Sequence, residues 1–213
     1  MRYGMMTRVR VKICGITSVN DAMLAVESGA DAIGLVFYEP SPRNIDILLA
    51  RKIVDSLPPF VTPVALFVDP PVSLVKKVMF ELGPLMLQFH GNEPEVFCSQ
   101  FKLPYMKAIR VRSDVNLLQC ANLYPSASAL LADTYIEGTA GGSGQTFDWT
   151  LLPESLPCPL ILSGGLDAGN ITQAIRQVRP YAVDVSSGVE RTKGIKDALK
   201  IKAFMQGVAD AAV

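Results

Sequence analysis

Eight short apolar runs recur along the chain, most of them followed by a polar turn and a stretch with helical periodicity. This repeat constrains the fold more than any other feature of the sequence. Strands that are apolar on both faces and separated by helices are typical of a parallel sheet covered by helices. The segment Ser18–Gly29 is one predicted helix, with a serine cap at its start and a glycine after its end. The runs occupy residues 9–14, 31–37, 62–68, 84–89, 105–109, 129–133, 159–163 and 182–186.

Eight strand and helix units predict an α/β fold in which the sheet closes into a (β/α)8 TIM barrel. The length of 213 residues is near the short end for that fold, and an open doubly wound sheet is the alternative. No linker or low-complexity tract divides the chain. We therefore expect an N-terminal extension over residues 1–8 and one catalytic barrel domain over residues 9–213.

Charge and cysteine usage exclude several classes of partner. The chain has 20 basic and 20 acidic side chains, no long basic run and no apolar stretch of the roughly 18 residues that cross a bilayer. We therefore expect neither a nucleic-acid nor a membrane partner. The start of the chain has no apolar run typical of a secretory signal, which favours the cytoplasm. The four cysteines lack CxxC or metal spacing and indicate free thiols.

Polar residues at the ends of the predicted strands mark the expected catalytic face, because barrel chemistry is carried by the carboxyl ends of the strands. Cys14 ends the first strand, and Gly15 frees the backbone to turn away. Asp133 ends the sixth strand. An acid and a base on opposite walls of one pocket would suit proton transfer on a sugar phosphate. Free cysteines are usually inert packing, which is how we interpret Cys98, Cys120 and Cys158.

Glycines and serines after the seventh and eighth strands provide bare backbone amides where barrels commonly hold a phosphate. The alternative is that these glycines only make tight turns. Two clusters on adjacent strands favour the phosphate site. The residues concerned are Gly164, Gly165, Ser186, Ser187 and Gly188.

Three further features of the catalytic face have both a functional and an ordinary interpretation. The glycine-rich segment Thr139–Trp149 is long enough for a lid that excludes water, or it is a surface loop. Arg43 suits a substrate carboxylate, or it is a solvated charge. His90 is the only histidine, and a lone histidine at a strand end is more often a structural hydrogen-bonding group than a catalyst.

Several motifs, in their order along the chain, resemble the phosphoribosylanthranilate isomerase family. They are VKICGIT with Cys14, SPR with Arg43, LQFHG with Gln88 and His90, LLADT with Asp133, GGSGQTFDW, LSGGL and VDVSSGVE. The resemblance runs from about residue 9 to the last helix. It implies a barrel that converts N-(5-phosphoribosyl)anthranilate to 1-(2-carboxyphenylamino)-1-deoxyribulose 5-phosphate by an Amadori rearrangement in tryptophan biosynthesis. Such an aldose-ketose isomerase, an intramolecular oxidoreductase, uses no cofactor and no metal.

The resemblance also implies a role for each matching residue. Asp133 is the general acid that protonates the furanose ring oxygen, and Cys14 is the general base that removes the proton from the adjacent sugar carbon. Because a thiol has an ordinary pKa of about 8.5, we expect surroundings that favour the thiolate. The substrate is bound by Arg43, which holds its carboxylate, and by Gln88, His90 and Asp184. The phosphate is bound by Gly142, Gly144, Gly164, Gly165, Ser186, Ser187 and Gly188. Whether such a chain is a monomer or a homodimer is left open.

Three other functions are less consistent with the residues. Histidine-pathway sugar isomerases run the same chemistry on the same fold, but they resemble a pattern with Asp in place of Cys14. Ribulose-phosphate epimerases need metal-binding histidines, which one histidine does not supply. A phosphosugar-binding protein without activity would not need both Cys14 and Asp133.

Strand alternation places Lys12 two residues before Cys14 and therefore in the barrel interior, one layer deeper. Asp184 and Ser186 on the eighth strand should also face inward. We hypothesise a buried Lys12 to Asp184 ion pair that helps to ionise Cys14, the alternative being a lysine that merely fills the barrel floor. The same reasoning predicts that Lys107 lies beside Asp133 and favours its carboxylate.

Overall fold

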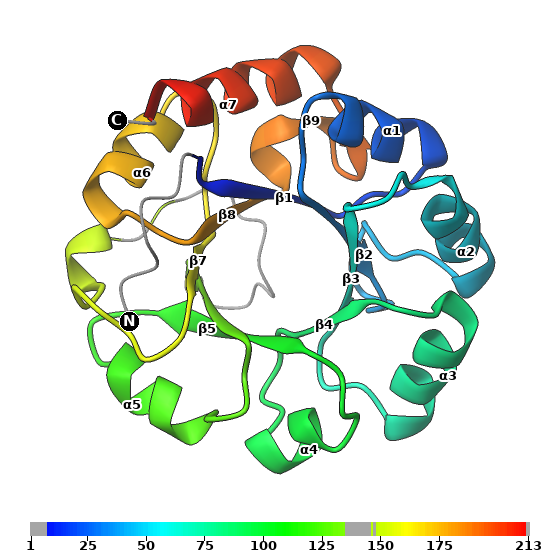
Figure 1. Cartoon of the computed structure of the whole chain (residues 1–213), viewed down its shortest axis with the longest axis horizontal. Coiled ribbons are helices and arrows are strands. Elements are labelled where there is room, and N and C mark those ends of the chain that lie inside the picture. The colour runs from blue at the N-terminus through cyan, green and yellow to red at the C-terminus, as the bar shows by residue number, and fades with distance from the viewer. Residues whose placement is uncertain (1–7, 135–145, 147, 212–213) are drawn as a thin grey trace.

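All eight predicted strands form, and they close into a single parallel barrel in the computed structural model of the chain (Figure 1). The structure describes residues 8–134, 146 and 148–211. The barrel excludes the open-sheet alternative, because β1 pairs with both β2 and β8. The strands are β1 (Arg10–Cys14), β2 (Ala32–Val36), β3 (Thr62–Phe67), β4 (Met86–Phe89), β5 (Tyr105–Val111), β6 (Ala129–Thr134), β7 (Leu160–Leu162) and β8 (Ala182–Val185).

Helices cover the outside of this ring (Figure 1). The predicted cap of the first helix is confirmed, since the hydroxyl of Ser18 accepts a hydrogen bond of 3.0 Å from the amide of Asp21. Among the described residues, the connection from β6 to β7 contains only the 3-10 turn η1 (Trp149–Leu151). The α-helices are α1 (Val19–Glu27), α2 (Ile47–Ser56), α3 (Val72–Leu82), α4 (Glu95–Ser99), α5 (Leu117–Leu123), α6 (Ile171–Val178) and α7 (Ala198–Ala211).

Alternate residues of each strand face either the helices or the barrel interior. The larger apolar core lies between strands and helices and contains Ile13, Phe67 and Phe89. A separate apolar cluster fills the barrel floor with Val64, Met106, Ala108, Ala129, Leu131, Ile161 and Ala182. This packed floor supports a polar layer above it, at the carboxyl ends of the strands.

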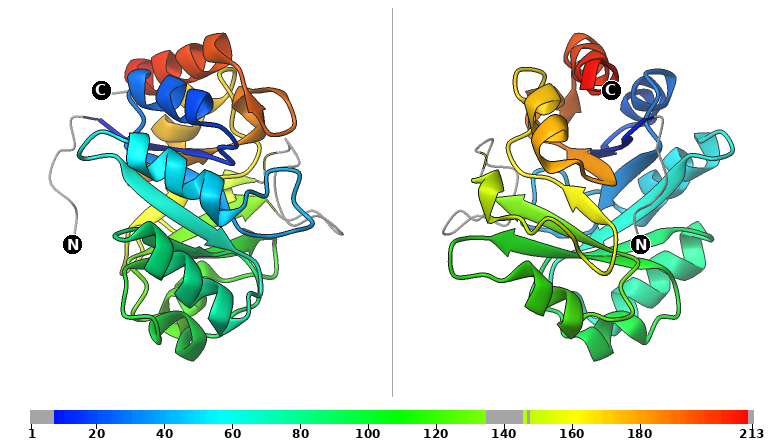
Figure 2. Two further views of the ribbon diagram at one scale, coloured as in Figure 1. Left: turned by 90° about the vertical axis from the view of Figure 1, so that its right-hand side faces the viewer. Right: turned by 60° about the vertical axis from the view of Figure 1, so that its left-hand side comes forward.

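A small antiparallel hairpin follows β8 and was not predicted from the sequence. It consists of β9 (Glu190–Thr192) and β10 (Ile195–Lys196), which η2 (Ser187–Val189) connects to the barrel. Its turn uses Gly194 with a φ of 82°, in the left-handed region that favours glycine. Figure 2 shows this orange hairpin at the same end of the barrel as the light-blue loop that follows β2. The hairpin therefore borders the catalytic face.

The predicted extension over residues 1–8 stays a prediction, because residues 1–7 lie outside the described part. Arg8 forms a forked pair with the carboxylate of Asp31, at 2.6 and 2.9 Å. Within the described ranges, no helix has the length and apolarity that a membrane crossing requires.

Candidate active site

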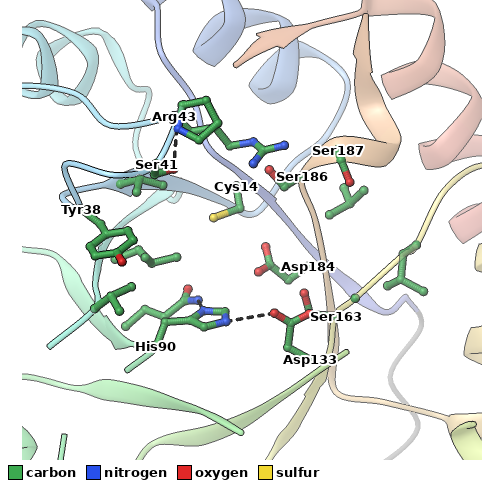
Figure 3. Close-up of a pocket in the computed structure, with 18 of the residues that line it drawn as sticks. Cys14, Tyr38, Ser41, Arg43, His90, Asp133, Ser163, Asp184, Ser186 and Ser187 are labelled. Carbon is green, nitrogen blue, oxygen red and sulfur yellow. Dashed lines mark hydrogen bonds and ion pairs between the residues drawn. The ribbon is translucent and has the colours of Figure 1, made fainter. Parts of the chain in front are cut away.

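A cavity of about 370 Å³ opens at the carboxyl ends of the strands, and the predicted catalytic residues line it. That volume lies within the range of small-molecule sites. Figure 3 shows the Cys14 side chain between Arg43 and the pair formed by His90 and Asp133. Of the predicted site residues, those that line the cavity are Cys14, Arg43, Gln88, His90, Asp133, Gly164, Gly165, Asp184, Ser186 and Ser187. Gly142 and Gly144 lie outside the described residues, as does most of the predicted lid segment 139–149.

The thiol of Cys14 occupies space that exists because β2 has a glycine beside it. Gly34 is the register partner of Cys14, and a β-carbon at that position would lie 2.5 Å from Sγ. After Cys14 the chain turns at Gly15, whose φ is 74°. A β-carbon there would lie 2.4 Å from Cδ of Arg43. Both glycines therefore allow close approach, one for the thiol and one for the arginine.

Burial raises the pKa of the Cys14 thiol above its ordinary value, although the charge of Lys12 acts in the opposite direction. The negative charge of Asp184 adds to the increase. The expectation that the surroundings favour the thiolate is therefore wrong for this structure. The reason is that desolvation outweighs the attraction of the ammonium groups of Lys12 and Lys196, the first of which is also paired with Asp184.

The predicted pair of Lys12 and Asp184 is confirmed. Nζ of Lys12 donates to Oδ1 of Asp184 at 2.8 Å, and the two residues are register partners on β1 and β8. Lys12 is only 3% exposed, so the carboxylate satisfies a cation that the barrel interior would otherwise leave unpaired. Asp184 also lines the cavity floor.

Asp133 is held by two hydrogen bonds on different oxygens. Its Oδ1 accepts from the amide of Thr134 at 2.9 Å, and its Oδ2 lies 2.9 Å from Nε2 of His90. Nδ1 of His90 lies 3.0 Å from Nε2 of Gln88, so the three side chains form a buried row. A β-carbon at Gly164 would lie 2.8 Å from Oδ1 of Asp133, and that glycine therefore leaves the carboxyl its space.

The prediction that Lys107 sits beside Asp133 is wrong. Lys107 lies between Met106 and Ala108 of the barrel floor, so alternation turns it toward the outer side of β5. Its Nζ donates to Oε2 of Glu93 at 2.8 Å and to the carbonyl of Gly91 at 2.6 Å.

Arg43 lines the cavity with one edge of its guanidinium already bonded. Its Nε and Nη2 donate to Oε1 and Oε2 of Glu190, each at 2.8 Å. This hydrogen bonding is the largest reason that the pKa of Arg43 is raised. Arg43 is therefore a buried, oriented cation rather than a solvated charge. Sequence reasoning missed Glu190, because its contact with Arg43 joins residues 147 positions apart.

The loops after β7 and β8 approach each other closely through glycine. Gly164 and Gly165 have φ values of 86° and 64°, and their amides donate to no group among the described residues. Gly188 does not line the cavity. A β-carbon there would lie 2.0 Å from the carbonyl oxygen of Leu166, so this glycine lets the two loops pack.

No group of three or more His, Cys, Asp or Glu side chains within the described ranges has the arrangement of a metal site. The titratable groups that line the cavity suit proton transfer, with a thiol and a carboxyl group on different walls.

Comparison with known proteins gives a consistent set of similarities. Residues 11–207 match the family model described as N-(5'phosphoribosyl)anthranilate (PRA) isomerase. The N-(5'-phosphoribosyl)anthranilate isomerase of Nitrosospira multiformis is 58% identical over 200 residues, which are 94% of this chain and 96% of that protein.

Solved structures agree with the sequence comparison. The phosphoribosyl anthranilate isomerase of Thermotoga maritima superposes with a TM-score of 0.85 at 42% identity, over 94% of this chain and 98% of that one. A structure of such an isomerase with reduced 1-(o-carboxyphenylamino)-1-deoxyribulose 5-phosphate has a TM-score of 0.80 at 39% identity, with the same coverage. A third structure, of monomers generated from the dimeric phosphoribosylanthranilate isomerase of Thermotoga maritima, has a TM-score of 0.81 at 40% identity, again with the same coverage.

Proposed function

The chain belongs to the N-(5'-phosphoribosyl)anthranilate isomerase family, and from this premise we propose that Cys14 and Asp133 perform the proton transfers of its reaction. The enzyme isomerises N-(5-phosphoribosyl)anthranilate in tryptophan biosynthesis. The observation that carries the assignment of roles is the placement of a thiol and a carboxyl group in one cavity of about 370 Å³. The product is 1-(2-carboxyphenylamino)-1-deoxyribulose 5-phosphate, an aminoketose formed by Amadori rearrangement.

Asp133 acts first, as the general acid. It gives its proton to the furanose ring oxygen while the bond from that oxygen to C1 breaks, which leaves an iminium ion between C1 and the anthranilate nitrogen. The hydrogen bonds from the Thr134 amide and with His90 fix both oxygens of the carboxyl group, which supports this role. A carboxyl group held in this way needs no reorganisation when the proton moves.

Cys14 acts second, as the general base. The positive iminium acidifies the hydrogen on C2, and the thiolate removes it, so that the electron pair forms a C1–C2 double bond and neutralises the nitrogen. The resulting enol-amine takes a proton at C1 and loses the proton of its C2 hydroxyl, which gives the ketone. Burial raises the pKa of the free thiol. The iminium cation beside Cys14 supplies the charge that favours the thiolate at this step.

The cavity also has a wall that suits the aromatic part of the substrate. Val36 and Leu66 form an apolar cluster with Cys14, and Tyr38 and Val68 pack against it. An anthranilate ring placed on this wall would bring its carboxylate toward Arg43, which lies on the loop after β2, the strand that ends at Val36. A guanidinium matches a carboxylate in geometry and charge.

The phosphate would bind where the loops after β7 and β8 meet. The amides of Gly164 and Gly165 and the serines Ser186 and Ser187 support this assignment, because bare amides and hydroxyls suit an anion. Gly188 contributes by letting the loops approach. Gln88 and Asp184 complete the cavity beneath the sugar.

Assembly and location follow from the same premise. The related Thermotoga maritima enzyme is dimeric, and we propose a monomer or homodimer that works in the cytoplasm, where its pathway operates. Sedimentation of the purified chain distinguishes the two assembly states.

The proposed function is tested with purified protein and phosphoribosylanthranilate, whose fluorescence disappears on conversion. We expect the protein to extinguish this fluorescence without added metal or cofactor, and to form the aminoketose phosphate. A protein that leaves the fluorescence unchanged would contradict the proposal.

A further inference from the structure

The hairpin after β8 brings a buried group of three charges against the catalytic face. Oε1 of Glu190 accepts from Nε of Arg43 at 2.8 Å and from Nζ of Lys196 at 2.9 Å. Oε2 of Glu190 accepts from Nη2 of Arg43 at 2.8 Å. All three residues are less than a tenth exposed, so the group consists of two cations and one anion removed from water. Removal of Glu190 would leave two buried cations without their shared anion, which destabilises a protein.

Lys196 connects this group to the seam at which the barrel closes. Its Nζ also donates to the carbonyl of Cys14 at 2.6 Å and to the carbonyl of Ser186 at 3.1 Å. Cys14 ends β1 and Ser186 follows β8, and these strands pair with each other. The ammonium group therefore fixes the hairpin to the backbone of the catalytic thiol and to the start of the loop assigned to phosphate.

The edge of the Arg43 guanidinium formed by Nη1 and Nη2 remains available to bind a ligand in the cavity. Glu190 occupies the side edge, made by Nε and Nη2, and Nη1 has no hydrogen-bond partner among the described residues. A guanidinium can bind a second carboxylate through Nη1 and the remaining hydrogen of Nη2. Because Glu190 is held by both cations, it determines which way this free edge points.

We propose that Glu190, held by Lys196, is a positioning residue that orients Arg43 and thereby determines recognition of the substrate carboxylate. This inference rests on the proposed function, in which Arg43 meets that carboxylate. Neither Glu190 nor Lys196 lines the cavity, so both act through Arg43 rather than by touching the substrate. The hairpin, together with the loop after β2, then determines specificity for an anthranilate.

The test compares two ligands that differ only in the carboxylate. One is reduced 1-(2-carboxyphenylamino)-1-deoxyribulose 5-phosphate, and the other is its phenylamino counterpart without the carboxyl group. Calorimetry gives the dissociation constant of each for the wild type, Glu190→Gln and Lys196→Met. Glu190→Gln turns an amide nitrogen toward the cations. We expect it to weaken the carboxylated ligand about tenfold or more and to leave the other nearly unchanged.

The variants should also affect the two kinetic constants of the isomerase reaction unequally. Glu190→Gln should raise KM for phosphoribosylanthranilate more than it lowers kcat, and Lys196→Met should do the same to a smaller extent. Lys200→Met is the matched control, because Nζ of Lys200 bonds the backbone carbonyl of Glu190, at 2.7 Å, and no side chain among the described residues. It should leave both ligands and both kinetic constants unchanged.

Equal weakening of the two ligands in a folded Glu190→Gln protein, or no weakening of either, would overturn the inference. If Glu190→Gln does not fold, as its thermal unfolding would show, Glu190→Asp takes its place. Glu190→Asp keeps the charge but shortens the reach, and a selective loss for the carboxylated ligand is again required. A wild type that binds the carboxylated ligand but has no isomerase activity would refute the proposed function and leave this inference standing.

Discussion

Nε2 of His90 lies 2.9 Å from Oδ2 of Asp133 in the interior of the barrel. The amide nitrogen of Gln88 faces the other ring nitrogen at 3.0 Å, and an amide N–H donates. In this arrangement Nδ1 accepts, Nε2 carries the hydrogen, and His90 donates to the carboxyl group of Asp133. The histidine therefore orients the proposed acid, which is more than the ordinary structural role expected of a lone histidine at a strand end.

Removal of this orienting contact should reduce turnover. We expect His90→Ala to lower kcat by about tenfold to a hundredfold, because Asp133 loses one of its two fixed hydrogen bonds. His90→Gln should keep more activity, since its amide extends nearly as far as Nε2. Steady-state kinetics on both variants, with thermal unfolding as the control for folding, measure the difference. Wild-type kcat in His90→Ala would contradict the role.

Arg43→Ala should raise KM for phosphoribosylanthranilate by about tenfold or more, because a charged, bidentate contact is lost. It also leaves Glu190 with Lys196 as its remaining charged partner, so the stability of the variant must be measured separately. Arg43→Lys should recover little affinity, since an ammonium group does not reproduce the fork. An unchanged KM in a folded Arg43→Ala protein would exclude the contact with the carboxylate.

Lys12→Met should shift the pH at which Cys14 reacts with iodoacetamide upward. Burial raises the pKa of Cys14, the charge of Lys12 lowers it, and the nearby charges of Asp184 and Lys196 act in opposite directions. Loss of Lys12 removes a lowering contribution and leaves Asp184 unpaired, so both changes raise the pKa of the thiol. At a fixed pH the alkylation rate should fall.

The alkylation profile needs a control that changes charge without changing the site. Lys202 is exposed on α7, and Lys202→Met should leave the profile as it is in the wild type. Coincident profiles for Lys12→Met and the wild type would show that the buried pair does not influence the thiol.

Gly34→Ala should reduce the activity of Cys14, the proposed base, although the thiol itself is retained. The added β-carbon would lie 2.5 Å from Sγ of Cys14, and Gly34 has no positive φ that would strain the backbone. The thiol must therefore move, and we expect kcat to fall more than KM rises. Gly169→Ala is the matched glycine control and should keep wild-type kinetics, because the position is exposed and the added β-carbon would lie 3.2 Å from Oδ1 of Asp167.

The sequence predicts the fold and the interior pair for the same physical reason. Buried parallel strands are apolar on both faces, so the eight apolar runs predict the strands. The alternation of side chains every two residues then predicts that Lys12 lies opposite Asp184. The same rule turns Lys107 outward, because its neighbours Met106 and Ala108 face the barrel floor. Alternation predicts the direction of a side chain only when the apolar residues of the same strand show which alternate positions face the barrel interior.

Other features of the site were beyond sequence reasoning because they depend on contacts between distant segments. The hairpin strands Glu190–Thr192 and Ile195–Lys196 are too short to show a periodic pattern. In the sequence, Gly34 is one glycine in an apolar strand, and its importance depends on its register partner Cys14, which the sequence does not show. The balance of burial against Lys12 at the thiol also requires the three-dimensional arrangement.

The most direct test of the proposed proton transfers is the rate at which substrate fluorescence disappears, compared among the wild type, Cys14→Ala and Asp133→Asn. Each substitution removes one proton-transfer group and retains nearly the same shape, so kcat should fall by about 10² to 10⁴ in each variant. Affinity for the reduced aminoketose phosphate should change far less. Near-wild-type kcat in a folded Cys14→Ala or Asp133→Asn protein would contradict the assignment of that residue and, with it, the two-step mechanism.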